Sequence, residues 1–225
     1  MKKLFVAIRH GDKEAVRQMI EKKPELVACI ARQPPKKDDG QSPLQVAIKT
    51  GAFEIANFLL DWGADVNFME AEDCCNNWRA PVVHDAIMAA VMCSRWNVAV
   101  EDGRGGWKAE VQGGSQKDAD EAFALLKRMI DQGADLNVVD SMGNSCAWRL
   151  CLSASQVLPS YNHETHQWRN DRILTPEIRA DLSRIFDLLY ENGMDDDYIR
   201  PGEYPVSVRE LFKGEAVAEF FRPRK

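Results

Sequence analysis

The chain has 225 residues, 45% of them hydrophobic, so it can bury an extensive core without disulfides or metal. Its formal net charge of −6 at pH 7 argues against binding a nucleic-acid backbone, which proteins usually contact through clustered cations. No apolar run is long enough to span a bilayer, and Met1–Gly11 lacks a signal-peptide pattern. We therefore expect a cytoplasmic protein that contacts no membrane.

The first predicted element is a pair of helices within residues 1–33. Leu4, Ala7 and Ile8 recur at positions i, i+3 and i+4, which predicts a helix with one apolar face. The segment that follows contains Pro34-Pro35-Lys36-Lys37. Because it is polar and stiff, we expect an exposed loop there.

The next unit, residues 38–70, has the clearest helical hairpin signature. Ser42 before Pro43 reads as a helix N-cap followed by proline at a position that needs no N–H, and Gly63 ends a second helix. Its first helix carries Leu44, Ala47 and Ile48, matching Leu4, Ala7 and Ile8 of the preceding unit.

This stretch, GQSPLQVAIKTGAFEIANFLLDWGADVN at residues 40–67, resembles one complete ankyrin repeat. The resemblance implies an all-α solenoid of stacked helical hairpins, with about four to five repeats over a single domain, residues 1–225. Ankyrin proteins bind other macromolecules and rarely perform chemistry. We therefore expect a non-enzymatic module for protein–protein interaction.

The third repeat is predicted over residues 77–138, with an insertion at 94–117 between its helices. The end motif Gly133–Asn137 restates Gly63–Asn67, but too far along the chain for one ordinary repeat. Within the insertion, apolar residues alternate with polar ones on either side of a glycine-rich stretch, which predicts a β-hairpin near 96–111. The alternating residues are Trp96, Val98 and Val100, then Trp107, Ala109 and Val111.

The fourth repeat is predicted over residues 140–196, with an insertion at 153–176. Thr175-Pro176 marks the start of its second helix. The insertion itself is polar and irregular, so we expect a loop with a short helix. Residues 203–225 would form a truncated helix pair that caps the stack.

Both insertions leave the same point of consecutive repeats, so they should emerge from one edge and could form one annex. Large aromatic residues there, if exposed, would anchor a partner. The alternative is that they only attach each insertion to the helices. The partner-binding residues we predict are Trp78, Trp96, Trp107, Tyr161 and Trp168.

Four residues have the order of zinc-finger ligands, namely Cys146, Cys151, His163 and His166. We expect the order to be accidental, because the cysteines lie five apart on a helix and point in different directions. His84 stands at the histidine position of the ankyrin consensus, where the ring usually serves a structural hydrogen bond. Neither catalytic residues, nor a cofactor, nor a metal is therefore predicted, and Cys74-Cys75 reads as unpaired thiols.

Two functional classes follow, with a third of lower standing. The first is a module that binds a partner protein through the ankyrin groove and the inserted loops. The second is an immunity or inhibitor protein that neutralises a cognate bacterial toxin, and the third is a secreted effector that binds a host protein. Because the chain is acidic, a basic partner is the natural complement, and we expect a monomer when free.

Overall fold

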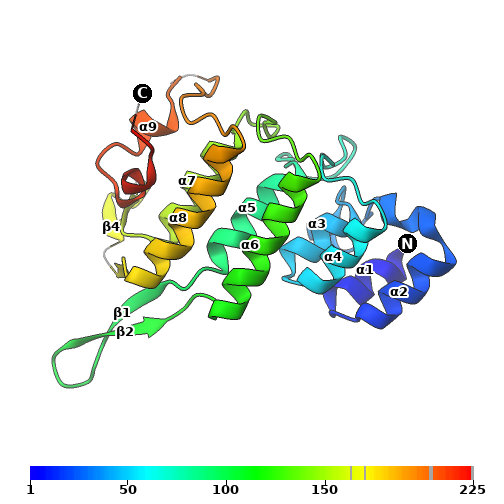
Figure 1. Cartoon of the computed structure of the whole chain (residues 1–225), viewed down its shortest axis with the longest axis horizontal. Helices are drawn as coiled ribbons and strands as arrows, with labels where there is room; N and C mark the ends of the chain where they lie inside the picture. Colours follow the sequence, from blue (N-terminus) through cyan, green and yellow to red (C-terminus); the bar gives the residue numbers. More distant parts are fainter. Residues whose placement is uncertain (163, 170, 203–204, 224–225) are drawn as a thin grey trace.

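The computed structural model describes residues 1–162, 164–169, 171–202 and 205–223. Its eight longest described helices form four antiparallel pairs that stack side by side from the N-terminus to the C-terminus (Figure 1). They are α1 (Lys2–Arg9), α2 (Lys13–Lys22), α3 (Pro43–Lys49), α4 (Phe53–Asp61), α5 (Val82–Met92), α6 (Gln116–Asp131), α7 (Cys146–Val157) and α8 (Pro176–Glu191).

Side-chain caps start the helices where the sequence places Ser or Thr. The Ser42 hydroxyl accepts the main-chain N–H of Gln45, and Pro43 occupies the first turn of α3. Thr175 caps α8 in the same way by accepting the N–H of Ile178. Both predicted helix starts are therefore confirmed.

The core is a continuous layer between two rows of helices. Helices α1, α3, α5 and α7 pack against one another in that order, and α2, α4, α6 and α8 form the second row. Leu44, Ala47 and Ile48 of α3 are buried. The apolar stripes thus cover one another, which is what a solenoid requires for stability.

The loops that follow α4, α6 and α8, here called fingers, share one turn. In each, an aspartate accepts the main-chain N–H of the residue two positions later, a turn that this short side chain favours. The pairs are Asp65 with Asn67, Asp135 with Asn137, and Asp195 with Asp197, at 2.8, 2.8 and 2.9 Å. Neighbouring fingers are also joined, because Asn67 donates to the Gly133 carbonyl at 3.0 Å and accepts the Asp135 N–H at 2.8 Å.

The first insertion forms the predicted β-hairpin, from β1 (Asn97–Glu101) and β2 (Trp107–Val111). The second insertion differs from the prediction of a loop with a short helix. Helix α7 runs on to Val157, and the following residues form β3 (Ser160–Asn162), β4 (Gln167–Arg169) and β5 (Arg172–Ile173). Strands β3 and β4 pair with each other, whereas β5 pairs antiparallel with β1.

The two insertions therefore share a three-stranded sheet of order β2-β1-β5, which we call the annex. A single annex was predicted from the positions of the insertions, and the pairing of Asn97 with Ile173 and of Val98 with Arg172 confirms it. An all-α description holds for the stacked body but not for the insertions.

The C-terminal segment covers the last apolar face with two short helices, α9 (Val208–Leu211) and η3 (Ala216–Phe220). Phe220 stacks on Phe186 of α8 with ring centres 5.2 Å apart. At the other end, η1 (Pro24–Ala28) and η2 (Lys36–Asp38) lie in the long link between α2 and α3. None of the described helices is long and apolar enough to cross a membrane.

Candidate partner-binding surface

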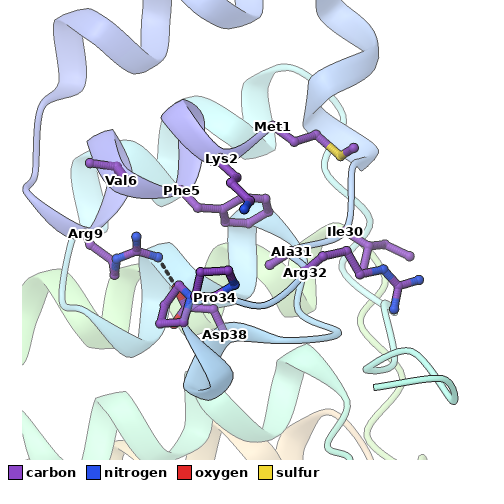
Figure 2. A pocket seen from close by; sticks show the side chains of 11 residues that line it. Met1, Lys2, Phe5, Val6, Arg9, Ile30, Ala31, Arg32, Pro34 and Asp38 are labelled. Atoms are coloured by element: carbon purple, nitrogen blue, oxygen red, sulfur yellow. Dashed lines mark hydrogen bonds and ion pairs between the residues drawn. The ribbon is translucent and has the colours of Figure 1, made fainter. Parts of the chain in front are cut away.

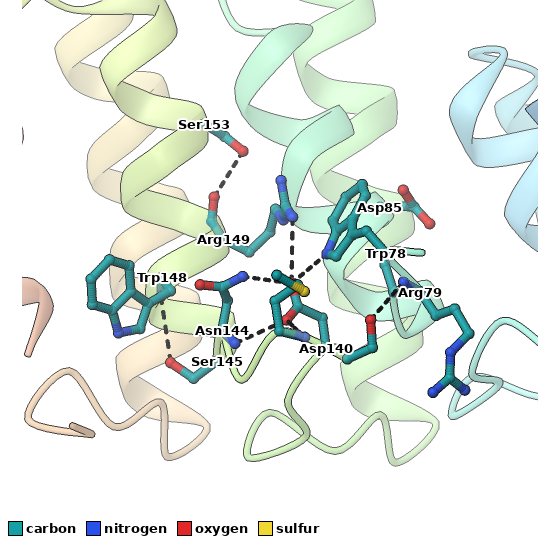
Figure 3. Close-up of polar contacts among 12 residues, drawn as sticks. Trp78, Arg79, Asp85, Asp140, Asn144, Ser145, Trp148, Arg149 and Ser153 are labelled. Atoms are coloured by element: carbon teal, nitrogen blue, oxygen red, sulfur yellow. Dashed lines mark hydrogen bonds and ion pairs between the residues drawn. The ribbon is translucent and has the colours of Figure 1, made fainter. Parts of the chain in front are cut away.

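Trp78 lies in the loop between α4 and α5 and is held by its neighbours (Figure 3). Its indole Nε1–H donates to Oδ2 of Asp140 at 2.7 Å, and the guanidinium of Arg149 lies 4.6 Å from the ring centre. A cation over an aromatic face is attracted by the ring quadrupole. Trp78 is 38% exposed, so it presents part of a rigidly oriented ring to solvent.

Asp140 lies buried in the next loop, between α6 and α7, and accepts several hydrogen bonds there. It also accepts the main-chain N–H groups of Met142 and Asn144, both at 2.9 Å, and the Asn144 side-chain amide at 2.8 Å. Burial alone would raise the pKa of Asp140. The hydrogen bonds from Asn144 and Trp78 outweigh burial and hold that pKa below its usual value, so the carboxylate stays ionised.

Trp107 is the most exposed of the predicted aromatic residues, at 70%. It lies on β2 of the annex, where Ala109 and Val111 point to the same face because side chains alternate along a strand. Val111 is 65% exposed, so this face is apolar and open to solvent. Such a surface is what a partner-binding site needs.

The annex is fixed to the body by an ion pair between Arg95, at its base, and Asp181 of α8. Arg95 donates to Asp181 from its main-chain N–H at 3.0 Å and from Nε and a terminal nitrogen at 2.9 Å each. Sequence reasoning missed this pair, because its members are 86 residues apart and no local pattern marks either one.

Gly113 and Gly114 close the base of the hairpin. A Cβ atom on Gly113 would lie 2.1 Å from the Ser94 carbonyl oxygen, and one on Gly114 would lie 2.3 Å from that of Cys93. These glycines let the returning strand pass directly over the end of α5. They therefore set the direction in which β2 leaves the body.

Trp96 contacts both α5 and the second insertion. It is half-buried against the core, its Nε1–H donates to the Met92 carbonyl at 3.2 Å, and Arg172 of β5 lies over its ring at 4.9 Å. These contacts are those expected if the aromatic residue attaches its insertion to the helices. Trp96 attaches the annex to α5 and offers little free surface.

Tyr161 and Trp168 meet across the β3–β4 hairpin. Their rings pack edge to face with centres 5.4 Å apart, and Trp168 is 53% exposed while Tyr161 is half-buried. The structure therefore unites two of the predicted residues in one exposed pair. Trp78 and Trp107 lie elsewhere, Trp78 in the loop between α4 and α5 and Trp107 on β2.

His84 and Asp85 point to opposite neighbours, as expected for consecutive helical residues. Burial, and next the charge of Arg149, lower the pKa of His84 to about 4, so the ring is neutral at pH 7. Burial raises the pKa of Asp85 to about 6, opposed by the Lys49 ammonium and by the Gln45 amide, which donates at 2.7 Å. The two side chains are therefore not arranged as a catalytic pair.

The cysteines show no reactive arrangement in the described part of the chain. Burial raises the pKa of the Cys146 thiol to about 12 and raises that of Cys151 as well. Among the described residues, no three His, Cys, Asp or Glu side chains are grouped closely enough to hold a metal. His166 is exposed, and His163 lies outside the described residues. Cys74 and Cys75 are half-buried free thiols.

A pocket between α1 and the link to α3 was not predicted (Figure 2). It has a volume of about 190 Å³ and mainly apolar walls. Phe5 and Pro34 line it, and the ion pair of Arg9 with Asp38 lies at its edge. The link segment Pro34–Lys37 is largely exposed, as expected, but the buried Asp38 behind it turns the loop toward α1.

Comparison with protein-family models matches residues 2–70 to the model described as ankyrin repeats (3 copies). It identifies no catalytic family. Comparison with curated proteins finds no match. The matched segment contains the helices α1 to α4, whose stacking and caps are described above. Ankyrin repeats generally mediate protein–protein interaction. The protein therefore carries ankyrin repeats, identified directly over residues 2–70.

Proposed function

We propose that this chain is a non-enzymatic module that binds one partner protein through its annex, at one end of the helices, and through the groove of fingers and first-row helices. The observation that carries the proposal is the exposed Trp107–Val111 face on a sheet that Arg95 and Asp181 fasten to the body. Exposed apolar surface costs solubility unless a partner covers it, and a tryptophan, with only two side-chain torsions, loses little entropy on binding.

The groove requires that the repeat series continue beyond residue 70. We propose ankyrin-type units at 77–138 and 140–196, with the cap at 203–225. The support is the packing of α3, α5 and α7 in one row and the recurrence of the finger turn at Asp65, Asp135 and Asp195. Trp78, at the start of the unit 77–138, then faces the same partner as a second contact.

The charge of the fingers favours a basic partner. Asp65, Asp135 and Asp195 are exposed and recur once per unit, so they form a row of carboxylates along the solenoid. Such a row accelerates association with a cationic surface and makes the rate depend on salt.

The experiment is affinity capture by the full chain from the native cell, followed by titration of the captured protein. Trp107→Ala and Trp78→Ala should each weaken binding by about tenfold or more, as truncation of an interface tryptophan does. Trp62→Ala is the matched control, because Trp62 is 37% exposed and caps α4 of the second row of helices, on neither the annex nor the first-row helices. Equal binding by all three variants would refute the proposed surface.

A second candidate is an inhibitor, of which an immunity protein that neutralises a bacterial toxin is one kind. The observation that favours it is the union of two insertions in one sheet, since a single elaborate projection suits one partner better than many. If the captured protein is an enzyme, its activity should fall to zero at an equimolar amount of the chain. If the enzyme kept full activity when saturated with the chain, the inhibitor candidate would be excluded and the interaction module would remain.

The compartment is part of the same proposal. The six cysteines are all free, which supports a reducing environment such as the cytoplasm. We expect the partner to be met there.

A further inference from the structure

Strand β2 is the open edge of the annex, and its main-chain direction can be derived. The main-chain N–H of Asp102 donates to the Gly106 carbonyl at 2.9 Å, and that of Gln112 donates to the Trp96 carbonyl at 3.1 Å, at the two ends of the β1–β2 pair. Hydrogen-bonded pairs alternate along an antiparallel ladder, so Lys108 and Glu110 bond inward to β1.

It follows that the N–H and C=O groups of Trp107, Ala109 and Val111 point away from β1. No other strand of the described chain pairs with them, because the sheet order is β2-β1-β5. The hairpin projects from the end of the helical body, with β2 clear of the stacked helices (Figure 1). An open edge of this kind is a template for another strand.

The residues of β2 are complementary to a second copy of themselves. In an antiparallel pairing centred on Ala109, each Ala109 lies opposite the other, Lys108 lies opposite Glu110 of the second copy, and Trp107 lies opposite its Val111. The charged pairs are of opposite sign and are formed twice. The Trp–Val pairs place an aromatic ring against a β-branched side chain, which is a favourable cross-strand combination.

The main-chain groups also fit this register. Ala109, Trp107 and Val111 carry the outward-pointing N–H and C=O groups, and the same register sets them opposite one another as hydrogen-bonded pairs. A two-fold axis through Ala109 thus satisfies backbone, charge and apolar complementarity together. Two-fold contacts require this kind of self-complementary patch.

We propose that two copies of this chain dimerise by antiparallel pairing of their β2 strands about Ala109. The two annexes then form one six-stranded sheet, and the Trp107–Val111 faces of both copies lie side by side. This pairing uses main-chain groups at the edge and does not depend on the partner protein proposed above. It replaces the monomer expected from the sequence.

Sedimentation equilibrium of the full chain tests the proposal. The wild type should shift with concentration from 25.4 kDa to twice that mass. Lys108→Glu places two glutamates opposite each other across the two-fold axis, and Glu110→Lys places two lysines opposite each other. Each variant alone should raise the dimer dissociation constant by about tenfold or more.

The charge exchange supplies the decisive controls. The double variant Lys108→Glu/Glu110→Lys restores both opposite-sign pairs and should dimerise as the wild type does. An equimolar mixture of the two single variants should form a heterodimer, because every cross-strand pair is then of opposite sign. Among the described residues neither side chain forms an ion pair, and the one side-chain hydrogen bond that the exchange removes is the one Glu110 accepts from the Gln112 amide at 3.2 Å.

Two results would overturn the proposal. One is a wild type that stays at 25.4 kDa up to about 1 mM. The other is dimerisation that is unchanged in Lys108→Glu or is not restored by mixing, which would place the contact elsewhere. Circular dichroism of each variant checks that the chain remains folded. If the edge receives a strand of the partner protein instead, the wild type alone stays monomeric.

Discussion

Arg95 and Asp181 are joined by three hydrogen bonds, although one stands at the base of the first insertion and the other within α8. The Asp181 side chain is only 2% exposed, whereas that of Arg95 is 25% exposed. Removal of the arginine side chain leaves the buried carboxylate with fewer partners, namely the main-chain N–H of residue 95 at 3.0 Å and Arg184 at 3.4 Å. The pair therefore holds the annex against the fourth helical unit.

We predict that Arg95→Ala lowers the free energy of unfolding by about 2 kcal/mol, because the buried carboxylate of Asp181 loses two charge-assisted hydrogen bonds and keeps only Arg184 as a charged partner. Urea unfolding of the full chain measures this. Arg104→Ala at the tip of the hairpin is the matched control, since that exposed side chain should contribute less than about 0.5 kcal/mol. Similar losses in both variants would contradict the role assigned to Arg95.

Gly114→Ala should destabilise the junction of annex and body. Its Cβ would lie 2.3 Å from the Cys93 carbonyl oxygen, a main-chain atom that cannot rotate away. We expect a loss of about 1–3 kcal/mol, the range typical of overpacking. Gly103→Ala is the control, because a Cβ there would meet no other atom within 4 Å. The only cost of that substitution is the positive φ of 73°. Thermal unfolding of both variants should show the larger drop for Gly114→Ala.

His84 and Asp85 give opposite dependences of stability on pH. The folded pKa of His84, about 4, lies below its ordinary value of 6.5, so its contribution to stability is lost as pH falls from 6.5 to 4. The folded pKa of Asp85, about 6, lies above its ordinary value of 3.8, so its contribution is lost as pH rises from 3.8 to 6. The two slopes nearly cancel between pH 4 and 6.

Asp85→Asn removes one of these slopes and should reveal the other. Between pH 6.5 and pH 4 the variant is predicted to lose about 3 kcal/mol more stability than the wild type, in which the Asp85 contribution opposes that of His84. Urea unfolding at several pH values measures the difference. His84→Gln is the reciprocal variant, and its stability should fall as pH rises. If the stability of the wild type and of both variants changed with pH in the same way, neither His84 nor Asp85 would contribute as described.

Trp78→Phe tests the orientation of the exposed indole. The ring under Arg149 is retained, but Asp140 loses the N–H donor at 2.7 Å. We expect a loss of about 1–2 kcal/mol in unfolding free energy and a rise in the pKa of Asp140. NMR titration of that carboxyl measures the second effect. If Trp78→Phe leaves both quantities unchanged, the indole is not held as described.

Local sequence signals predicted the body of the fold well. Ser42 and Thr175 were recognised as caps because capping depends on residues within one turn. The β1–β2 hairpin was recognised because its alternation is regular. The β3–β4 hairpin was missed because its strands, Ser160–Asn162 and Gln167–Arg169, are too short and polar to show a period.

The candidate surface was predicted less completely, since it depends on contacts between distant residues. Trp107 and Trp96 look alike in the hairpin pattern. Only the approach of Arg172 from the second insertion makes Trp96 an attachment point, with the cation 4.9 Å from its ring. The N-terminal pocket likewise arises from the return of Asp38 onto Arg9, which no short motif encodes.

The pairing of β1 with β5 has a consequence for how this protein can change over evolutionary time. Repeat arrays commonly lengthen or shorten by gain or loss of single units, because each unit contacts only its neighbours. Here the strand Arg172–Ile173, between α7 and α8, completes the sheet that grows from the segment between α5 and α6. Deletion of either unit would leave the other's half of the sheet incomplete, so the two are expected to be inherited as one indivisible block.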